Sequence, residues 1–125
     1  MASYKYNQNN FCLECHEEIF NPLCPVCLSR EIKQWLQNKP AKVKSVVNTE
    51  IKRMLTLAKY DDYTKCVSCM RNKTFMCPYC FTERIYNKMK EEGANKRILM
   101  EFLEIFNFDL EHTGYSKDME KFGML

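Results

Sequence analysis

The arrangement of eight cysteines constrains this chain more than any other feature, because they form four C-x-x-C pairs. The pairs group into two units. Eight residues separate the two pairs of the first unit, and seven separate those of the second. The members are Cys12, Cys15, Cys24, Cys27, Cys66, Cys69, Cys77 and Cys80, and no cysteine lies outside the scheme. Self-similarity of this kind predicts two copies of one supersecondary unit.

The repeat continues beyond the cysteines. The stretch "CPVCLSREIKQWL" begins at Cys24, and "CPYCFTERIYNKM" begins at Cys77. In both, Pro follows the first cysteine, a large apolar residue follows the second, and Ile stands eight positions after the first. The two motifs are therefore expected to carry out the same chemistry.

Four cysteines at this spacing are typical of a closed zinc site, in which four thiolates bind Zn²⁺ tetrahedrally at about 2.3 Å. We expect each unit to bind one ion through its own four cysteines. The predicted order is knuckle, short hairpin, knuckle and helix, as in a treble-clef finger. Ser29 and Thr82 follow the second knuckles and are expected to be helix N-caps.

Other chemistries fit parts of the pattern. Cys77-Pro78-Tyr79-Cys80 is also the glutaredoxin motif, but that site follows a strand, and residues 60–76 are polar. Residues 12–16 match the c-type haem motif C-x-x-C-H, whereas the second unit has Met70 in place of His16. An iron–tetrathiolate centre stays open, since it uses the same sulfurs. A cross-braced, RING-like pairing also stays open, although the repeat favours two sequential sites.

Two further segments have helical periodicity. Residues 42–59 place apolar residues on one broad face and basic residues on the other, which predicts an amphipathic helix. Residues 94–108 are densely apolar and predict a buried helix that joins the two modules into one core. A short last helix capped by Ser116 is expected near the C-terminus.

The predicted fold is small, zinc-stabilised and mainly α with short β-hairpins. Two tandem four-cysteine modules occupy residues 1–38 and 63–92. An amphipathic basic linking helix occupies residues 39–62, and an apolar helical segment occupies residues 93–125. The length of 125 residues allows a sizeable core.

The charge is uneven along the chain. The formal net charge is +3, but residues 1–90 carry +7 and residues 91–125 carry −4. Two zinc ions, each bound by four thiolates, would lower the total to −1. Residues 29–59 hold eight basic and two acidic residues, a density that can neutralise phosphates.

We therefore expect a non-catalytic zinc protein that binds nucleic acid, RNA rather than DNA, or a ribonucleoprotein. A four-cysteine zinc site has no open position for substrate, and no other pattern resembles an active site, so an enzyme is not expected. The alternative is a protein–protein adapter that uses the apolar C-terminal helix. The predicted nucleic-acid contacts are Arg30, Lys33, Lys42, Lys52, Arg53, Lys59, Arg71 and Lys73.

No apolar stretch suits a secretion signal or a membrane span, so the expected location is the cytoplasm, with no membrane partner and no small-molecule substrate. Thiols stay reduced there, and paired cysteines then indicate metal ligands before disulfides.

At "CPYCFTE" and "FNFDLEHTGY" the chain resembles small, uncharacterised archaeal zinc-binding proteins with four-cysteine fingers and a short helical tail. Residues 12–36 and 66–89 are similar to treble-clef or zinc-ribbon modules generally. This resemblance implies bound zinc, and roles in nucleic-acid binding, in ribosome and polymerase subunits, or in protein adapters. Leu28 and Phe81 stand where ribbons have Gly, which favours a helix directly after each C-P-x-C motif.

Overall fold

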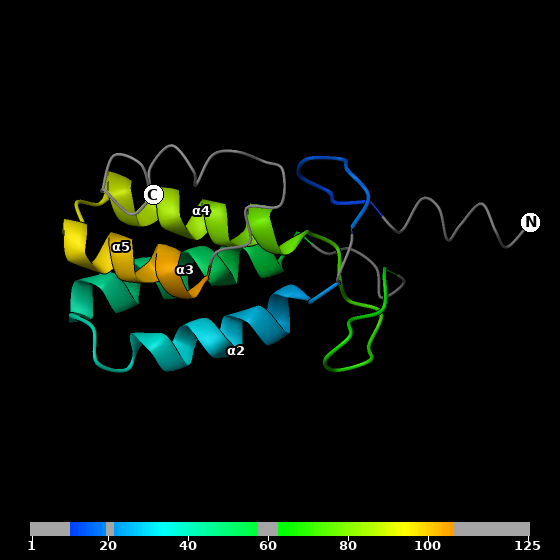
Figure 1. The fold of residues 1–125 in the computed structure, drawn as a ribbon, viewed down its shortest axis with the longest axis horizontal. Coiled ribbons are helices and arrows are strands. Elements are labelled where there is room, and N and C mark those ends of the chain that lie inside the picture. Colours follow the sequence, from blue (N-terminus) through cyan, green and yellow to red (C-terminus); the bar gives the residue numbers. More distant parts are fainter. Residues whose placement is uncertain (1–10, 20–21, 58–62, 107–125) are drawn as a thin grey trace, which may run out of the picture.

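The protein's structure, a computed structural model, describes residues 11–19, 22–57 and 63–106. The helices within these residues are α2 (Pro25–Leu36), α3 (Ala41–Leu55), α4 (Pro78–Glu91) and α5 (Lys96–Ile105). They pack into one bundle, and two cysteine-bearing loops lie at the end where α2 and α4 begin (Figure 1). The mainly helical fold predicted from the sequence is thus confirmed.

The two repeats begin their helices in the same way. Cys24 and Cys77 are the N-cap residues, both with extended backbone, and Pro25 and Pro78 open the helices. Proline suits this position because its φ is preset for the helix and its missing N–H would have no intrahelical partner there. The second cysteine of each pair therefore lies in the first helical turn.

The predicted capping role of Ser29 and Thr82 is wrong. The Ser29 hydroxyl donates to the Val26 carbonyl at 2.7 Å, and the Thr82 hydroxyl donates to the Pro78 carbonyl at 2.8 Å. Both side chains are buried inside their helices. Both helices start five residues earlier than expected, because proline sets the start. The two hydroxyls then bond back to the preceding turn.

The amphipathic helix predicted at residues 42–59 is confirmed as α3, which begins after Pro40. Its buried face consists of Val43, Val47, Glu50, Ile51 and Met54. This face packs chiefly against α4, and α2 packs on both α3 and α4. The apolar positions thus face the core as their spacing predicted, and Glu50 is the exception.

A tight turn reverses the chain between α4 and α5. Gly93 has a φ of +83°, and the N–H groups of Gly93 and Ala94 donate to the carbonyls of Lys90 and Met89 at 3.1 and 2.9 Å. This is the Schellman pattern, which satisfies the last carbonyls of a helix. The Asn95 side chain then accepts from the N–H of Ile98 at 2.9 Å and caps α5.

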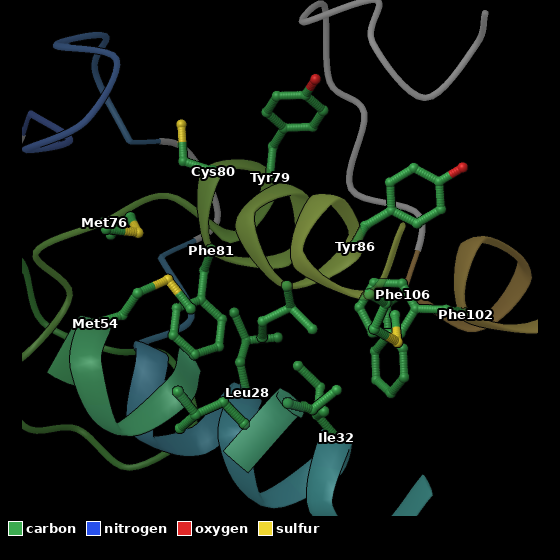
Figure 2. Close-up of a cluster of buried hydrophobic side chains, with 14 of the residues drawn as sticks. Leu28, Ile32, Met54, Met76, Tyr79, Cys80, Phe81, Tyr86, Phe102 and Phe106 are labelled. Carbon is green, nitrogen blue, oxygen red and sulfur yellow. The ribbon is translucent and has the colours of Figure 1, made fainter. Parts of the chain in front are cut away.

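The core lies where the first turns of α2 and α4 meet α3 (Figure 2). Leu28 and Phe81, the apolar residues that follow the second cysteine of each repeat, are both fully buried in it. Figure 2 shows Phe81 reaching from α4 between Met54 of α3 and Leu28 of α2. Equivalent positions of the two repeats therefore meet at the centre of one shared core.

The apolar helix predicted at residues 94–108 is observed as α5, which covers one side of the bundle. Trp35 of α2 packs edge-on against Phe102 and Phe106, with ring centroids 5.4 and 6.1 Å apart. Its indole N–H donates to Glu101 at 2.7 Å, and Glu101 also pairs with Lys39 at 2.6 Å. The prediction that this segment serves the core fits these contacts.

The predicted β-hairpins are not confirmed in the part of the chain that the structure describes. There the loops contain two isolated bridges, Phe11 with Glu18 and Thr64 with Thr74, and no strand. The reason lies in the backbone donors, several of which bond to sulfur or to the other repeat and so cannot form a ladder.

None of the described helices is long and apolar enough to cross a membrane. The predicted short last helix at Ser116 and the stretch "FNFDLEHTGY" lie wholly or mostly outside the described residues, as does Lys59. The division into segments 1–38, 39–62, 63–92 and 93–125 stays a prediction.

Candidate metal centres and nucleic-acid interface

The eight cysteines form two groups of four, and within each group all sulfurs lie within 4.8 Å of one another. The outer site consists of Cys12, Cys15, Cys77 and Cys80, and the inner site of Cys24, Cys27, Cys66 and Cys69. The expectation of two sequential sites is therefore wrong. A cross-braced pairing of first with third and second with fourth pair is also not observed, because the sites are nested along the chain.

Each site combines a knuckle of one repeat with the helix start of the other. Knuckle 1, residues 12–16, lies on the start of α4, and knuckle 2, residues 66–70, lies on the start of α2. Figure 1 shows both loops at this end of the bundle, with knuckle 1 in blue and knuckle 2 in green. The two repeats thus exchange their knuckles.

Matching contacts relate the two sites by an approximate two-fold symmetry. The N–H of Cys77 donates to the Cys12 sulfur, and the N–H of Cys24 donates to the Cys66 sulfur, both at 3.3 Å. The third residue of each knuckle also donates its N–H to the first sulfur at 3.3 Å.

The knuckle tips obey the same symmetry. Leu13 donates its N–H to the Phe75 carbonyl at 2.9 Å, and Val67 donates its N–H to the Pro22 carbonyl at 2.8 Å. The two acceptors occupy matching positions: Phe75 is two residues before Cys77, the N-cap of α4, and Pro22 is two residues before Cys24, the N-cap of α2. The residues that close the knuckles, His16 and Met70, both have a φ of 64°. Because Met70 has no imidazole, the feature that His16 and Met70 share is the backbone turn.

This symmetry explains why the pairing differs from the expectation. Two sequential sites would require each repeat to close on itself. Instead, α2 and α4 pack together with their starts at one end, and each repeat presents the same surface to the other, as subunits do in a two-fold dimer. Knuckle 1 then reaches the residues before α4, and knuckle 2 reaches those before α2.

The sulfur positions fit a tetrahedral ion. Bonds of about 2.3 Å to zinc place tetrahedral sulfurs about 3.8 Å apart. The measured separations are 4.0 Å for Cys15–Cys77, and 3.8 Å for both Cys24–Cys69 and Cys27–Cys66. The residues present therefore suit a four-thiolate metal ion in each site. Such a site is closed, and its ion would stabilise the fold.

Hydrogen bonds concentrate negative charge on the first cysteine of each knuckle. Bonds from the thiols of Cys77 and Cys80 hold the pKa of Cys12 well below its usual range. Donation to Cys12 raises the pKa of Cys77 to about 12. Burial works against ionisation of Cys66, but backbone N–H groups, first that of Cys24, lower its pKa to about 6. Before a metal ion binds, the first cysteine of each knuckle is thus the one that ionises most readily.

An ion pair reinforces the outer site. Arg84 of α4 donates to both carboxylate oxygens of Glu14 in knuckle 1, at 2.8 to 3.0 Å. At the matching positions of the other half stand Glu31 in α2 and Ser68 in knuckle 2. Knuckle 1, which has Glu14, therefore contacts α4, which has Arg84 at this position, and not α2, which has Glu31.

The residues predicted to contact nucleic acid do not lie on one surface. Arg53 pairs with the buried Glu50 at 2.6 Å, so its guanidinium is already engaged.

The other predicted contacts are spread over the molecule. Lys42 lines a separate apolar pocket of 210 Å³ beside the turn between α4 and α5. Arg71 and Lys73 belong to the loop of knuckle 2. Arg30, Lys33 and Lys52 are exposed on α2 and α3.

A basic groove lies between α2 and α3. Two adjoining hollows of 450 and 380 Å³ share Lys33 and Asn48. Lys52 lines the first hollow and Lys44 lines the second. In the part of the chain that the structure describes, no acidic residue lines either hollow. We call this feature the basic groove. The described residues that line it carry positive charges and no negative charge.

Lys44 and Asn48 line the basic groove but are not among the nucleic-acid contacts predicted from the sequence. The spacing in the sequence could have indicated them, because Lys44, Asn48 and Lys52 follow each other at four-residue intervals and form one row on a helix. What the sequence did not supply was the partner helix, which brings Lys33 to the same row.

Comparisons of the chain with protein-family models, curated proteins and solved structures find no match. The resemblance to small archaeal zinc-binding proteins gains no support from them. The candidate sites therefore rest on their own geometry.

Proposed function

We propose that the chain is a non-catalytic module, held together by two zinc ions, that binds nucleic acid along the basic groove. The observation that carries the proposal is the set of three lysines, Lys33, Lys44 and Lys52, which converge from two helices. Among the described residues, none of the three forms an ion pair. Ammonium groups that lack protein partners are available to phosphate oxygens.

The spacing of the groove suits an extended polyanion. Lys44 and Lys52 are eight residues apart on α3, which corresponds to about 12 Å along the helix axis. Asn48 lies between them and can donate hydrogen bonds, as can Gln37, the C-cap residue of α2, in the second hollow. Lysines position a phosphate backbone, and amide side chains can contact sugars or base edges. We propose single-stranded RNA as the ligand.

The adapter alternative has less support. Its surface was the apolar C-terminal helix, but Ile98, Leu99, Phe102 and Leu103 of α5 are buried in the protein's own core. In the described part of α5, Ile105 is the exposed large apolar side chain. A single side chain does not make a docking surface.

The test compares two triple variants of equal charge. In the groove variant, Lys33, Lys44 and Lys52 become Gln. In the control, the exposed Lys42, Lys65 and Arg71 become Gln. Fluorescence anisotropy with a mixed-sequence single-stranded RNA measures affinity over a range of salt concentrations, and DNA of the same sequence tests the choice of RNA.

We expect the groove variant to bind RNA about tenfold more weakly or worse, with the slope of log affinity against log salt reduced by about 2. The control should retain most of the affinity. Equal losses in both variants would mean that binding follows total charge and that the groove is not the site. Full binding by the groove variant would exclude the proposal.

A further inference from the structure

The nested pairing makes each metal site depend on both repeats. Along the chain, 62 positions separate Cys15 from Cys77 in the outer site, and 39 separate Cys27 from Cys66 in the inner site. The inner site lies entirely within the loop that the outer site closes. Each repeat has four cysteines but contributes two of them to each site, so neither repeat completes a site alone.

Each ion would also fix the same geometric relation, the position of the start of α2 beside the start of α4. Knuckle 1 is joined to α2 by the nine positions from Cys15 to Cys24, and it binds at the start of α4. Knuckle 2 is joined to α4 by the eight positions from Cys69 to Cys77, and it binds at the start of α2. An ion in either site therefore holds the two helix starts together.

We infer that the two sites bind their metal ions cooperatively, so that the protein takes up a borderline-soft divalent cation such as Zn²⁺ in pairs. The first ion brings together the groups that the second ion needs. Two sequential sites, each closed by its own repeat, would instead load independently. The inference does not depend on nucleic-acid binding, because it uses the topology of the cysteines alone.

Loop closure sets the scale of the effect. When the inner site is filled, closing the outer site spans only the seventeen positions of the two short connections instead of 62. With loop entropy varying as three halves of the logarithm of length, the second ion is expected to bind about sevenfold more tightly. By linkage the same factor applies whichever site fills first.

Native mass spectrometry of the reduced, metal-free chain, titrated to half-saturation with Zn²⁺, measures the populations with zero, one and two ions. Two equal, independent sites place about half of the chains in the one-ion state, whereas sevenfold coupling places about a quarter there. A one-ion fraction of a half or more would overturn the inference.

Two knuckle variants provide a second, reciprocal measurement. C12S/C15S removes knuckle 1 ligands and leaves the inner site complete, and C66S/C69S leaves the outer site complete. Competition with a zinc chelator gives the affinity of each remaining site. We expect each to be weakened about sevenfold relative to the intact chain. Unchanged affinities in both variants would contradict cooperativity, and the titration of the intact chain decides the matter if a variant fails to fold.

Discussion

Glu50 has only 4% of its surface exposed, although its neighbours in the sequence place it on a basic, solvated helix. Its carboxylate accepts from Arg53 at 2.6 Å, and Arg84 of α4 approaches it at 4.0 Å. Arg84 also holds Glu14 of knuckle 1. Two acids and two guanidinium groups thus connect the outer metal site to α3, and a buried carboxylate is tolerated because it is paired.

Replacing Arg84 by Met should destabilise the protein by about 1–3 kcal/mol. The change removes the bidentate contact with Glu14 and leaves the buried Glu50 with Arg53 as its remaining partner. Urea unfolding of the metal-loaded protein, followed by circular dichroism, measures the free energy of unfolding.

Lys88→Met is the matched control, one turn further along α4. Among the described residues, Lys88 pairs with the exposed Glu91 and Glu92, at 4.0 and 3.9 Å, so its loss should cost about 0.5 kcal/mol or less. If both variants lose the same stability, the network around Glu50 contributes nothing specific.

At the scale of elements, the turn between α4 and α5 allows backbone strain to be measured separately from steric clashes. Gly93 has a positive φ, and a Cβ built there would meet no atom within 4 Å. We predict that Gly93→Ala lowers the free energy of unfolding by about 1–2 kcal/mol, through left-handed backbone strain and not through a clash. Urea unfolding measures the change.

Asn87→Ala, at an exposed position within α4, is the control and should be neutral or slightly stabilising. A neutral Gly93→Ala variant would show that the turn relaxes into another conformation.

The elements themselves could largely be predicted from the sequence. Apolar spacing located α3 and α5 because each buries one continuous face, which is a local property. The helix starts were misplaced, because Ser29 and Thr82 are good caps, and yet Pro25 and Pro78 begin the helices earlier. Glu50 could not be foreseen as buried, since its burial depends on the packing of α3 against α4, which also brings Arg84, distant in the sequence, to 4.0 Å.

For the whole molecule, the sequence indicated which cysteines form the candidate metal sites but not how they are divided between the two. The C-x-x-C spacing predicts each half-site, because the local backbone of a knuckle determines the positions of its two sulfurs. The choice of partner half-site depends on how α2 and α4 pack, and the repeat alone is compatible with closure within a copy or between copies. Similarly, Lys33 and Lys52 were found by composition, but only the packing of α2 on α3 makes them one groove.

A labelling experiment separates the possible pairings in one measurement. In the metal-loaded C12S/C15S variant, N-ethylmaleimide should modify Cys77 and Cys80, whose knuckle partners are gone. The cysteines of the inner site should stay protected, because metal-bound thiolates react slowly with the reagent when the site is closed and buried. Peptide mass spectrometry identifies the modified residues.

The other two topologies leave different cysteines without an ion. Sequential sites would expose Cys24 and Cys27, and a cross-braced arrangement would expose Cys66 and Cys69. The reciprocal variant C66S/C69S should label Cys24 and Cys27 while the outer site stays protected. Because the two-fold relation between the repeats requires both results, labelling that follows the nested pattern in one variant alone would contradict the exchange of knuckles.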